Sequence, residues 1–524
     1  MPRTHPIFEI LELIEAIVSW MPPHELIHTA LVNQKWFHAS IPYLWQSVSL
    51  KGALSPLGQW GMRRKGFCFI KTSTKTQWAR FLMYSKHVRL LEGSSLEGRL
   101  LRAATRFRPS LATYLFPNLR VLTWKTMREL TDLSALISPS LQSFGLKVPE
   151  LTVSSFQSIC HLLTNRLNVL RCLQIEVVFT SQTDIECDHL LQQLLTHFAT
   201  TLMWIQLPNI FYTEETLRRL HGVQRLCNLS IGTHHHSVIE EIPLSWTEPQ
   251  LFKREGNFDS LKSFSFSGSQ EKLCDKLLNR YILSALIDFT WHSCGHLDDA
   301  DSFITTLVYS CPQLATLTIG DSQIYFHTRR LPPVIQWPTL RPLLRLKNLS
   351  ALSLHCCRVQ MAPRDLIELL TSREAPRTWK VLEIFHVTPL RVSDISTYSK
   401  HCPDLERLGI NIDGYLLNYI LPPSDHNEYD IDELTELHPL PRRRFSRLAV
   451  IDFAYSKFHW TTSLAVSSIL LRISEIPIVA AGWDWPYWHD VSARVLARWE
   501  AGEGTRSDAG VRSGRSTPSS DERW

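Results

Sequence analysis

The sequence lacks closely paired cysteines. Its eleven cysteines are scattered along the chain, and no two of them form a CxxC pair. Cys356 and Cys357 are adjacent, an arrangement that does not easily meet the geometry of a structural disulfide. We therefore expect reduced thiols, which are typical of a protein of the cytoplasm, the nucleus or both.

Long charge-free apolar runs are missing as well. No window reaches the roughly 20 mostly apolar residues that a membrane-spanning helix requires. The nearest stretch, Leu464 to Ala481, contains Arg472, Glu475 and Pro477. The start of the chain, MPRTHPIFEI, has no basic region leading into an apolar core, so no secretory signal is predicted. We expect no membrane partner.

The sequence also has no recognisable catalytic or metal-binding motif. GxSxG, GxxxxGK and HExxH patterns are absent. The run His234 to His236 has no acidic or cysteine companion nearby, and adjacent side chains on a strand point to opposite faces. The pattern indicates a polar loop. We expect a non-catalytic protein without a cofactor or a metal site.

Charge of one sign is not in large excess. The net charge of +5 is mild for 524 residues, so nucleic acid is not an expected partner. The positive charge is concentrated in residues 63–108, which hold twelve lysines and arginines against Glu92 and Glu97. Such a segment either binds an acidic or phosphorylated partner or forms a solvated face. A later segment, residues 428–436, holds five acids and fits either a partner contact or a disordered loop.

What the chain does contain is a repeat, within a composition that is 44% apolar and 20% charged. The frame apolar-x-x-apolar-x-apolar occurs twelve times in order, 22 to 43 residues apart. The frames begin at Leu119, Leu141, Leu170, Leu202, Leu226, Leu261, Leu286, Leu314, Leu349, Trp379, Leu405 and Leu448. The last two apolar positions alternate with polar ones, which predicts a short strand with one buried face.

Helical segments separate the frames. Examples are SFITTLVYSCPQL, RDLIELLTS and SDISTYSKHCPDL. Pro117, Pro139, Pro312 and Pro403 precede strands and predict the ends of the preceding segments. One strand and one helix per unit, stacked side by side, would bury a continuous core that no single unit could bury alone. The alternative is an irregular α/β array.

Two frames carry the form Cys-Pro-x-Leu, at Cys311 and Cys402. Together with the twelve ordered frames, they resemble the leucine-rich repeats attached to F-box proteins, here of the fungal type. The resemblance implies an α/β fold: a small N-terminal helical F-box followed by an irregular leucine-rich-repeat solenoid, a horseshoe of strand–helix units.

The N-terminal segment favours a small helical bundle. Ile10, Leu11, Ile14, Ile17 and Val18 fall on one stripe of a helix. Pro22 and Pro23 break the chain, and a second apolar helix follows from Leu26 to Leu31. About 45 residues bury little surface alone. We therefore expect the apolar face of the bundle to bind a partner.

Residues 6–50 resemble the F-box motif. The matching positions are Glu9, Ile10, Leu11, Ile14, Leu26, Val32, Trp36, Leu44 and Trp45. Two departures are the proline displaced to Pro6 and the pair His24-Glu25 in place of an acidic residue. The resemblance implies a substrate-recognition subunit of a Skp/cullin/F-box ubiquitin ligase, in which a Skp-family adaptor links the chain to a cullin. The implied adaptor contacts are Pro6, Ile10, Leu11, Ile14, Leu26, Val32, Trp36, Leu44 and Trp45.

A second interpretation remains open, in which the N-terminal helices only cap a leucine-rich-repeat interaction scaffold that has no ligase role. In either case strand alternation predicts that the polar positions between buried ones lie on the concave face and contact a protein substrate. These residues are Trp204, Gln206, Asp288, His292, Glu383, Arg407 and Asp452.

The predicted organisation has five parts. They are an F-box module (1–50), a basic helical linker or N-terminal cap (51–110), the solenoid (111–460), a C-terminal cap (461–501) and a disordered tail (502–524).

Overall fold

The computed structural model divides into two units, Met1–Ser267 and Gly268–Trp524, and each is described by itself. The structure describes residues 10–497 except 64–65, 72, 108–113, 126–132, 150, 178–184, 209–210, 212–213, 233–255, 268–280, 293–299, 321–333, 372–377, 388–394, 412–444, 453–478, 482–490 and 494. Pro6, the acidic segment 428–436, His234 to His236, Phe453 and the predicted tail 502–524 lie outside the described residues.

The first unit begins with three helices, α1 (Leu11–Trp20), α2 (Pro23–Ala30) and α3 (Gln34–Leu44). Pro23 occupies the first position of α2, where its missing N–H costs no hydrogen bond. Asn33 caps α3, because its side-chain oxygen accepts hydrogen bonds from the backbone N–H groups of Lys35 and Trp36.

A short α/β segment follows the helices. It contains β1 (Ser47–Ser49), α4 (Leu50–Leu54), η2 (Ser55–Leu57), β2 (Trp60–Arg63), β3 (Gly66–Phe69), α5 (Lys75–Ser85), β4 (Leu90–Ser94), η3 (Ser95–Glu97) and α6 (Gly98–Arg106). Strands β2 and β3 form an antiparallel hairpin, whereas β4 pairs in parallel with β1.

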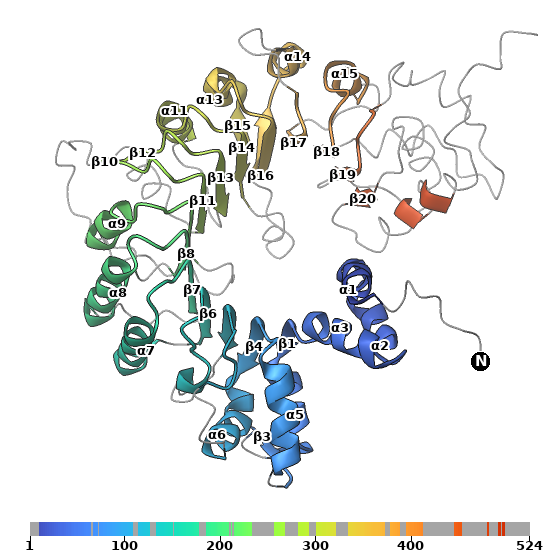
Figure 1. Cartoon of the computed structure of the whole chain (residues 1–524). Helices are drawn as coiled ribbons and strands as arrows, with labels where there is room; N and C mark the ends of the chain where they lie inside the picture. The colour runs from blue at the N-terminus through green and yellow to red at the C-terminus, as the bar shows by residue number, and fades with distance from the viewer. Residues whose placement is uncertain are drawn as a thin grey trace, which may run out of the picture. The chain divides into compact units, whose positions relative to one another are not determined.

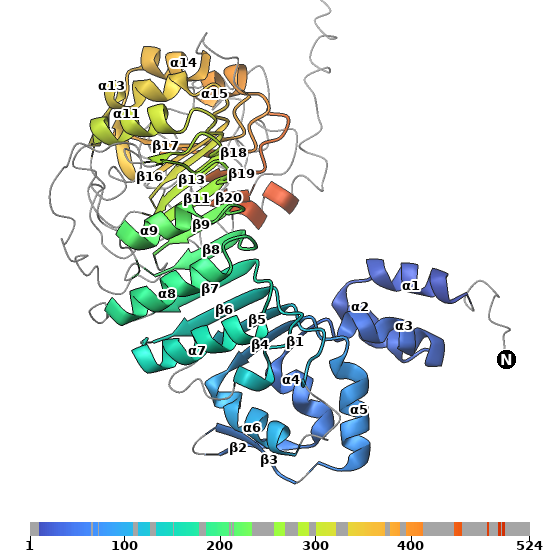
Figure 2. The ribbon, with the colours of Figure 1, turned by 60° about the vertical axis from the view of Figure 1, so that its left-hand side comes forward.

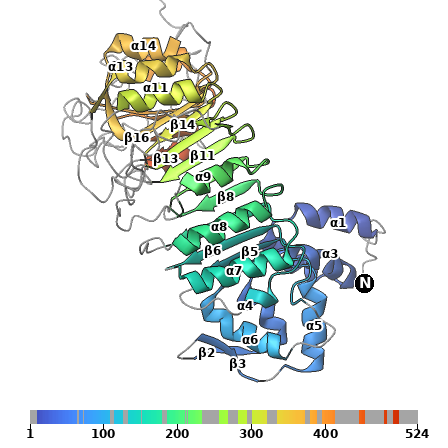
Figure 3. The same cartoon turned by 90° about the vertical axis from the view of Figure 1, so that its left-hand side faces the viewer.

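The main sheet of the first unit is parallel, in the order β1-β4-β5-β6-β7-β8-β9-β11. Its further elements are β5 (Val121–Lys125), η4 (Leu133–Ala135), β6 (Ser143–Val148), α7 (Val153–Arg166), β7 (Cys172–Val177), α8 (Ile185–His197), β8 (Trp204–Leu207), α9 (Glu214–His221), β9 (Asn228–Ile231), β10 (Gly256–Asn257) and β11 (Ser263–Ser267). Helices α7, α8 and α9 all cover the same face of this sheet (Figures 2 and 3).

In-register pairing aligns equivalent positions of successive frames. Phe144, Leu173, Ile205 and Leu229 lie in one row across β6 to β9, and all are buried. Each such side chain contributes about 1.5–3 kcal/mol when it leaves water. The row is therefore the core between the sheet and the helices, and the intervening polar positions lie on the open face of the sheet, away from the helices.

The backbone repeats as regularly as the core. Just before each strand, one carbonyl accepts two N–H groups from the next repeat: the Arg120 carbonyl accepts from Gln142 and Ser143, and the Gln142 carbonyl accepts from Arg171 and Cys172. The same arrangement recurs in the second unit at Ser350, whose carbonyl accepts from Lys380 and Val381. These hydrogen bonds join each repeat to the next one at the start of its strand.

The second unit repeats this plan, with a parallel sheet in the order β13-β14-β16-β17-β18-β19-β20 and β15 beside β16. Its elements are β12 (Tyr281–Ile282), β13 (Asp288–His292), α11 (Ala300–Ser310), β14 (Thr316–Ile319), β15 (Val334–Gln336), α13 (Trp337–Leu340), η6 (Arg341–Arg345), β16 (Ala351–Gln360), α14 (Pro363–Thr371), β17 (Val381–His386), α15 (Ile395–His401), β18 (Arg407–Gly409), β19 (Val450–Asp452) and β20 (Val479–Ala481). Helices α11, α13 and α14 lie on one face of this sheet (Figure 3).

A buried asparagine ties two neighbouring strand ends together in the second unit. Asn411 Oδ1 accepts a hydrogen bond of 2.6 Å from the His386 N–H, and Asn411 Nδ2 donates one of 2.7 Å to the His386 carbonyl. The His386 ring lies 3.1 Å from the Tyr398 hydroxyl, and burial lowers the pKa of His386 to about 4. Asn411 thus satisfies backbone groups that the end of the sheet leaves unpaired.

The predicted α/β repeat is confirmed, because all twelve frames place residues in strands of the two parallel sheets. The three predicted helical segments correspond to α11, α14 and α15. The structure differs from the prediction at the start of the sheet: β1 and β4 precede residue 111, and the segment predicted as a helical linker also holds the β2–β3 hairpin. No helix in the described part of the chain has the length and apolar character needed to cross a membrane.

Candidate functional site

The three N-terminal helices enclose a very small core. Ile14, Val18, Leu26 and Ala39 are buried, and Met21, Trp36 and Leu44 pack against them while partly exposed. So few buried side chains give little stabilisation by themselves.

The bundle leaves about half of its large apolar side chains exposed. The exposed aliphatic side chains together with Trp20, which we term the bundle surface, are Ile10, Leu11, Leu13, Ile17, Trp20, Ile27, Leu31 and Val32. Trp20 is 90% exposed, Leu31 80% and Val32 65%. Single exposed apolar residues need no explanation, but eight of them within residues 10–32 are a concentration typical of an interaction surface.

The predicted adaptor contacts divide into two groups in the structure. Ile10, Leu11 and Val32 belong to the bundle surface, whereas Ile14 and Leu26 lie in the interior and support it. Of the eight residues of the bundle surface, the predicted contacts omitted Leu13, Ile17, Trp20, Ile27 and Leu31.

Of the remaining predicted contacts in the described residues, Trp36 and Leu44 pack against the small core, and Trp45 connects the bundle to the sheet. Trp45 follows α3 and stacks on Tyr84 of α5, with ring centroids 4.5 Å apart and planes 7° from parallel. The carbonyl of Gln46, the next residue, accepts the N–H groups of Arg89 and Leu90 at the entrance of β4. The bundle is therefore attached to the first strands through Trp45 and Gln46.

The sequence positions predicted on the concave face fall at the open-face positions of the strands in both units, as strand alternation requires. In the first unit Trp204 is half-buried between Cys172 and Asn228 of the neighbouring strands, and Gln206 is aligned with Gln174. In the second unit Asp288 and His292 are half-buried on β13. Asp452 lies in register with Gly409 on the next strand.

Glu383 and Arg407, two of the predicted residues, meet in the second unit. The Glu383 carboxylate is 3% exposed and forms an ion pair with Nε of the half-exposed Arg407. Ser353 Oγ donates to Glu383 Oε2 over 2.5 Å, and His355 Nε2 lies 3.1 Å from the same oxygen. Four side chains from three adjacent strands therefore form one cluster, which we term the Glu383 cluster.

The Glu383 cluster favours an ionised carboxylate. Burial alone raises the pKa of Glu383, but the hydrogen bond and electrostatic interaction with His355, the charge of Arg407 and the hydroxyl of Ser353 together lower the pKa to about 2. Gly409 provides the space, since a Cβ there would lie 2.7 Å from Glu383 Cβ. Arg407 is thus held in place on the open face of the sheet.

The prediction missed Ser353, His355 and Gly409. The signal was present, because Ser353, Glu383 and Gly409 occupy the same position of successive frames and are in register across β16, β17 and β18. Within the described ranges, no group of three or more His, Cys, Asp or Glu side chains is placed to hold a metal ion. His234 to His236 lie outside those ranges.

Comparisons with known proteins add little to this description. No family model matches the sequence, and no curated protein matches it significantly. One similar solved structure is a protein from Bacteroides fragilis, which is 13% identical over 46% of this chain and 67% of that chain, with a TM-score of 0.22. Another is TLR13 in its complex with ssRNA13, which is 15% identical over 71% of this chain, with a TM-score of 0.36. The match spans about half of the TLR13 chain, 51%.

Both TM-scores are low, so the fold assignment rests on the repeated strand–helix units themselves. They have the architecture of leucine-rich repeats, a parallel sheet with helices on one face and an open face opposite. Such an open face is a surface suited to protein interactions.

Proposed function

We propose that this chain is the substrate-recognition subunit of a Skp/cullin/F-box ubiquitin ligase, with no catalytic activity of its own. The N-terminal helices dock a Skp-family adaptor and through it a cullin, and the open face of the repeats binds a protein substrate. Ubiquitin transfer is then promoted by proximity, because a bound substrate is held near the catalytic partners. The location is the cytoplasm, the nucleus or both.

The observation that carries the proposal is the bundle surface. A helical cap would turn its apolar residues toward the repeats, yet Trp20, Leu31 and Val32 are at least 65% exposed. These side chains gain little from folding in isolation, and each contributes about 1.5–3 kcal/mol once a partner buries it fully. The pattern of Val32, Trp36 and Leu44-Trp45 that resembles an F-box belongs to the same helices and their exit.

The Glu383 cluster supports the second half of the proposal. Arg407 reaches Glu383 through Nε, and no other ion pair of its guanidinium is formed among the described residues, so its terminal amino groups can serve a partner on the open face. A guanidinium that is already positioned loses less entropy on binding a carboxylate or an amide carbonyl. The open face therefore offers a fixed polar anchor beside the smaller residues Val381 and Gly409.

The test is retention of a purified Skp-family adaptor by the full chain. The double variant Leu11→Asp with Val32→Asp places two charges in the bundle surface and is expected to lose retention by at least about thirtyfold, as for a central contact of an interface. Both positions are exposed, 45% and 65%, so the fold is expected to survive. A cullin should co-purify with the adaptor only when retention is intact.

The matched control is Leu96→Asp with Val169→Asp, because Leu96 and Val169 are 50% and 40% exposed but lie outside the bundle. This control should retain the adaptor fully. Failure of the unaltered chain to retain adaptor would sink the ligase proposal. If instead Leu11→Asp with Val32→Asp leaves retention unchanged but lowers the melting temperature of the repeats, the helices are a cap and the chain is a scaffold without a ligase role.

A further inference from the structure

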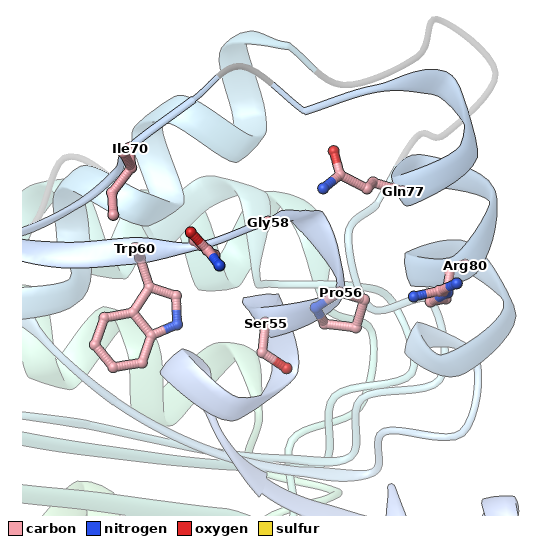
Figure 4. A pocket seen from close by; sticks show the side chains of 8 residues that line it. Ser55, Pro56, Gly58, Trp60, Ile70, Gln77 and Arg80 are labelled. Atoms are coloured by element: carbon pink, nitrogen blue, oxygen red, sulfur yellow. The ribbon is translucent and has the colours of Figure 1, made fainter.

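A cavity of about 520 Å³ lies away from the bundle surface and from the open face of the sheet, in the α/β segment of the first unit. Figure 4 shows its side chains, which come from η2, the β2–β3 hairpin with its flanks, and helix α5. The lining residues are Ser55, Pro56, Gly58, Gln59, Trp60, Ile70, Gln77 and Arg80. The lining thus combines apolar side chains and hydrogen-bond donors with one cationic group, the guanidinium of Arg80.

The donors are on helix α5 and η2. Arg80 is exposed, and no acidic side chain in the described part of the chain pairs with it. The Gln77 amide is fixed, because its Oε1 accepts a 2.7 Å hydrogen bond from the Thr74 N–H, which leaves Nε2 as a donor on the cavity side near Gly58. The Ser55 hydroxyl is a further donor in the lining.

The Trp60 ring of the apolar wall contacts two neighbouring side chains. Lys51 Nζ lies 4.0 Å from the centre of the Trp60 ring, and Phe67 packs edge-on against Trp60 with centroids 5.3 Å apart. One face of the indole is therefore occupied by a cation. A ring held in this way provides a fixed surface beside Arg80 but is poorly available for stacking a nucleic-acid base.

The surrounding charge favours an anion. Lys71, Lys75, Lys86 and Arg89 are exposed on α5 and its flanking loops. The two acids of residues 63–108 do not neutralise this positive charge in the cavity. Glu97 is buried and accepts a 2.9 Å hydrogen bond from the Ser94 N–H, and Glu92 lies on β4 of the main sheet. An anionic group entering beside Arg80 meets donors and no opposing carboxylate of the lining.

We propose that this cavity binds a phosphorylated serine or threonine in a segment of a protein partner. The guanidinium of Arg80 contacts two phosphate oxygens, Gln77 and Ser55 donate to the phosphate, and Pro56, Trp60 and Ile70 receive the neighbouring side chains of the segment. Phosphate suits these donors, because it carries nearly two negative charges and three acceptor oxygens. This site does not depend on adaptor docking, so either proposal can fail without the other.

The probe is a fluorescently labelled pool of nonapeptides with a central phosphothreonine and random flanks, titrated against the full chain. A second pool carries unmodified threonine and a third carries glutamate at the centre. The phosphorylated pool is expected to bind roughly tenfold or more tighter than the threonine pool, as for a charge-assisted bidentate contact. Equal binding of the phosphorylated pool and either comparison pool overturns the assignment to phosphate.

Two matched pairs of variants locate the binding. Arg80→Gln should weaken binding of the phosphorylated pool about tenfold, whereas Arg89→Gln removes the same charge from an exposed arginine outside the lining and should change it less than about twofold. Ile70→Glu places a negative charge in the lining and should abolish the preference, and Met62→Glu should not. Ile70 and Met62 are matched, being 57% and 63% exposed on the same hairpin.

Other outcomes overturn the proposal. Equal losses in Arg80→Gln and Arg89→Gln would mean attraction by overall charge and no site in the cavity. Binding to vesicles that contain phosphoinositides, lost equally in Ile70→Glu and Met62→Glu, would indicate a membrane surface. Displacement of the phosphopeptide pool by a mixed-sequence oligonucleotide at comparable concentration would indicate nucleic acid.

Discussion

Replacing Glu383 with glutamine is expected to remove a pH-dependent part of the stability of the second unit. Glutamine keeps the volume and an acceptor oxygen for Ser353, but it loses the charge that pairs with Arg407. Because the carboxylate is 3% exposed, solvent does not replace the lost interaction.

The size of the effect follows from the pKa of Glu383. Its pKa falls from 4.5 to about 2 on folding, and each pKa unit corresponds to about 1.4 kcal/mol. A carboxyl whose pKa is lowered in the folded state stabilises that state above the unfolded pKa, and the stabilisation is lost as the pH falls through the folded pKa. Ionisation of Glu383 thus contributes about 3 kcal/mol at pH 7 and about 1 kcal/mol at pH 3.

The assay is urea denaturation of the unaltered chain and of Glu383→Gln at pH 7 and pH 3, comparing the free energies of unfolding. The difference between the two proteins should be about 3 kcal/mol at pH 7 and should shrink by roughly two thirds at pH 3. Titrating groups outside the Glu383 cluster, including His386 with its pKa lowered to about 4 by burial, are common to both proteins and cancel.

Two results would refute this reasoning. A difference that is the same at both pH values would show that Glu383 acts through packing and not through its charge. A difference near zero at pH 7 would mean that the cost of burying the carboxylate cancels its interactions with His355, Arg407 and Ser353.

Two further predictions concern the same strands. Gly409→Ala should destabilise the second unit by about 1–3 kcal/mol, because the new Cβ would lie 2.7 Å from Glu383 Cβ. The control Gly145→Ala on β6 brings its new Cβ no closer than 3.5 Å to another atom and should change stability by less than about 1 kcal/mol. Equal urea midpoints for the two variants would contradict this prediction. Asn411→Ala should cost about 2–4 kcal/mol in the same assay, because it leaves both the N–H and the carbonyl of His386 buried without their partner, and an unchanged midpoint would show that other groups replace Asn411.

The strands were predictable because their signal is local. In the frame around Leu382 and Ile384 the apolar residues alternate with Glu383, and alternation by itself separates the buried face from the open one. Strand β4 lacks the full frame, because Gly93 stands at its last apolar position, and it forms because neighbouring strands supply parallel hydrogen-bond partners. That stabilisation comes from residues far away in the sequence.

The apolar stripe at residues 10–18 predicted a helix, but it did not predict which of its side chains are exposed. Five apolar residues share one side of α1 and its N-cap residue, yet only Ile14 and Val18 are buried, because a bundle of three short helices covers only a narrow strip of each. Exposure of Ile10, Leu11 and Ile17 is decided by where α2 and α3 pack.

The sequence by itself determined the repeat, the α/β class and the side of each strand that faces the core, since these depend on spacings of a few residues. Only the tertiary structure decided that Ser353, Glu383 and Arg407 form one cluster and that Ser55, Trp60 and Arg80 line one cavity. The physical reason is that register and helix packing bring together residues such as Glu383 and Arg407, or Trp60 and Arg80, that are 20 or more positions apart, and their distances and charges then depend on every element packed between them.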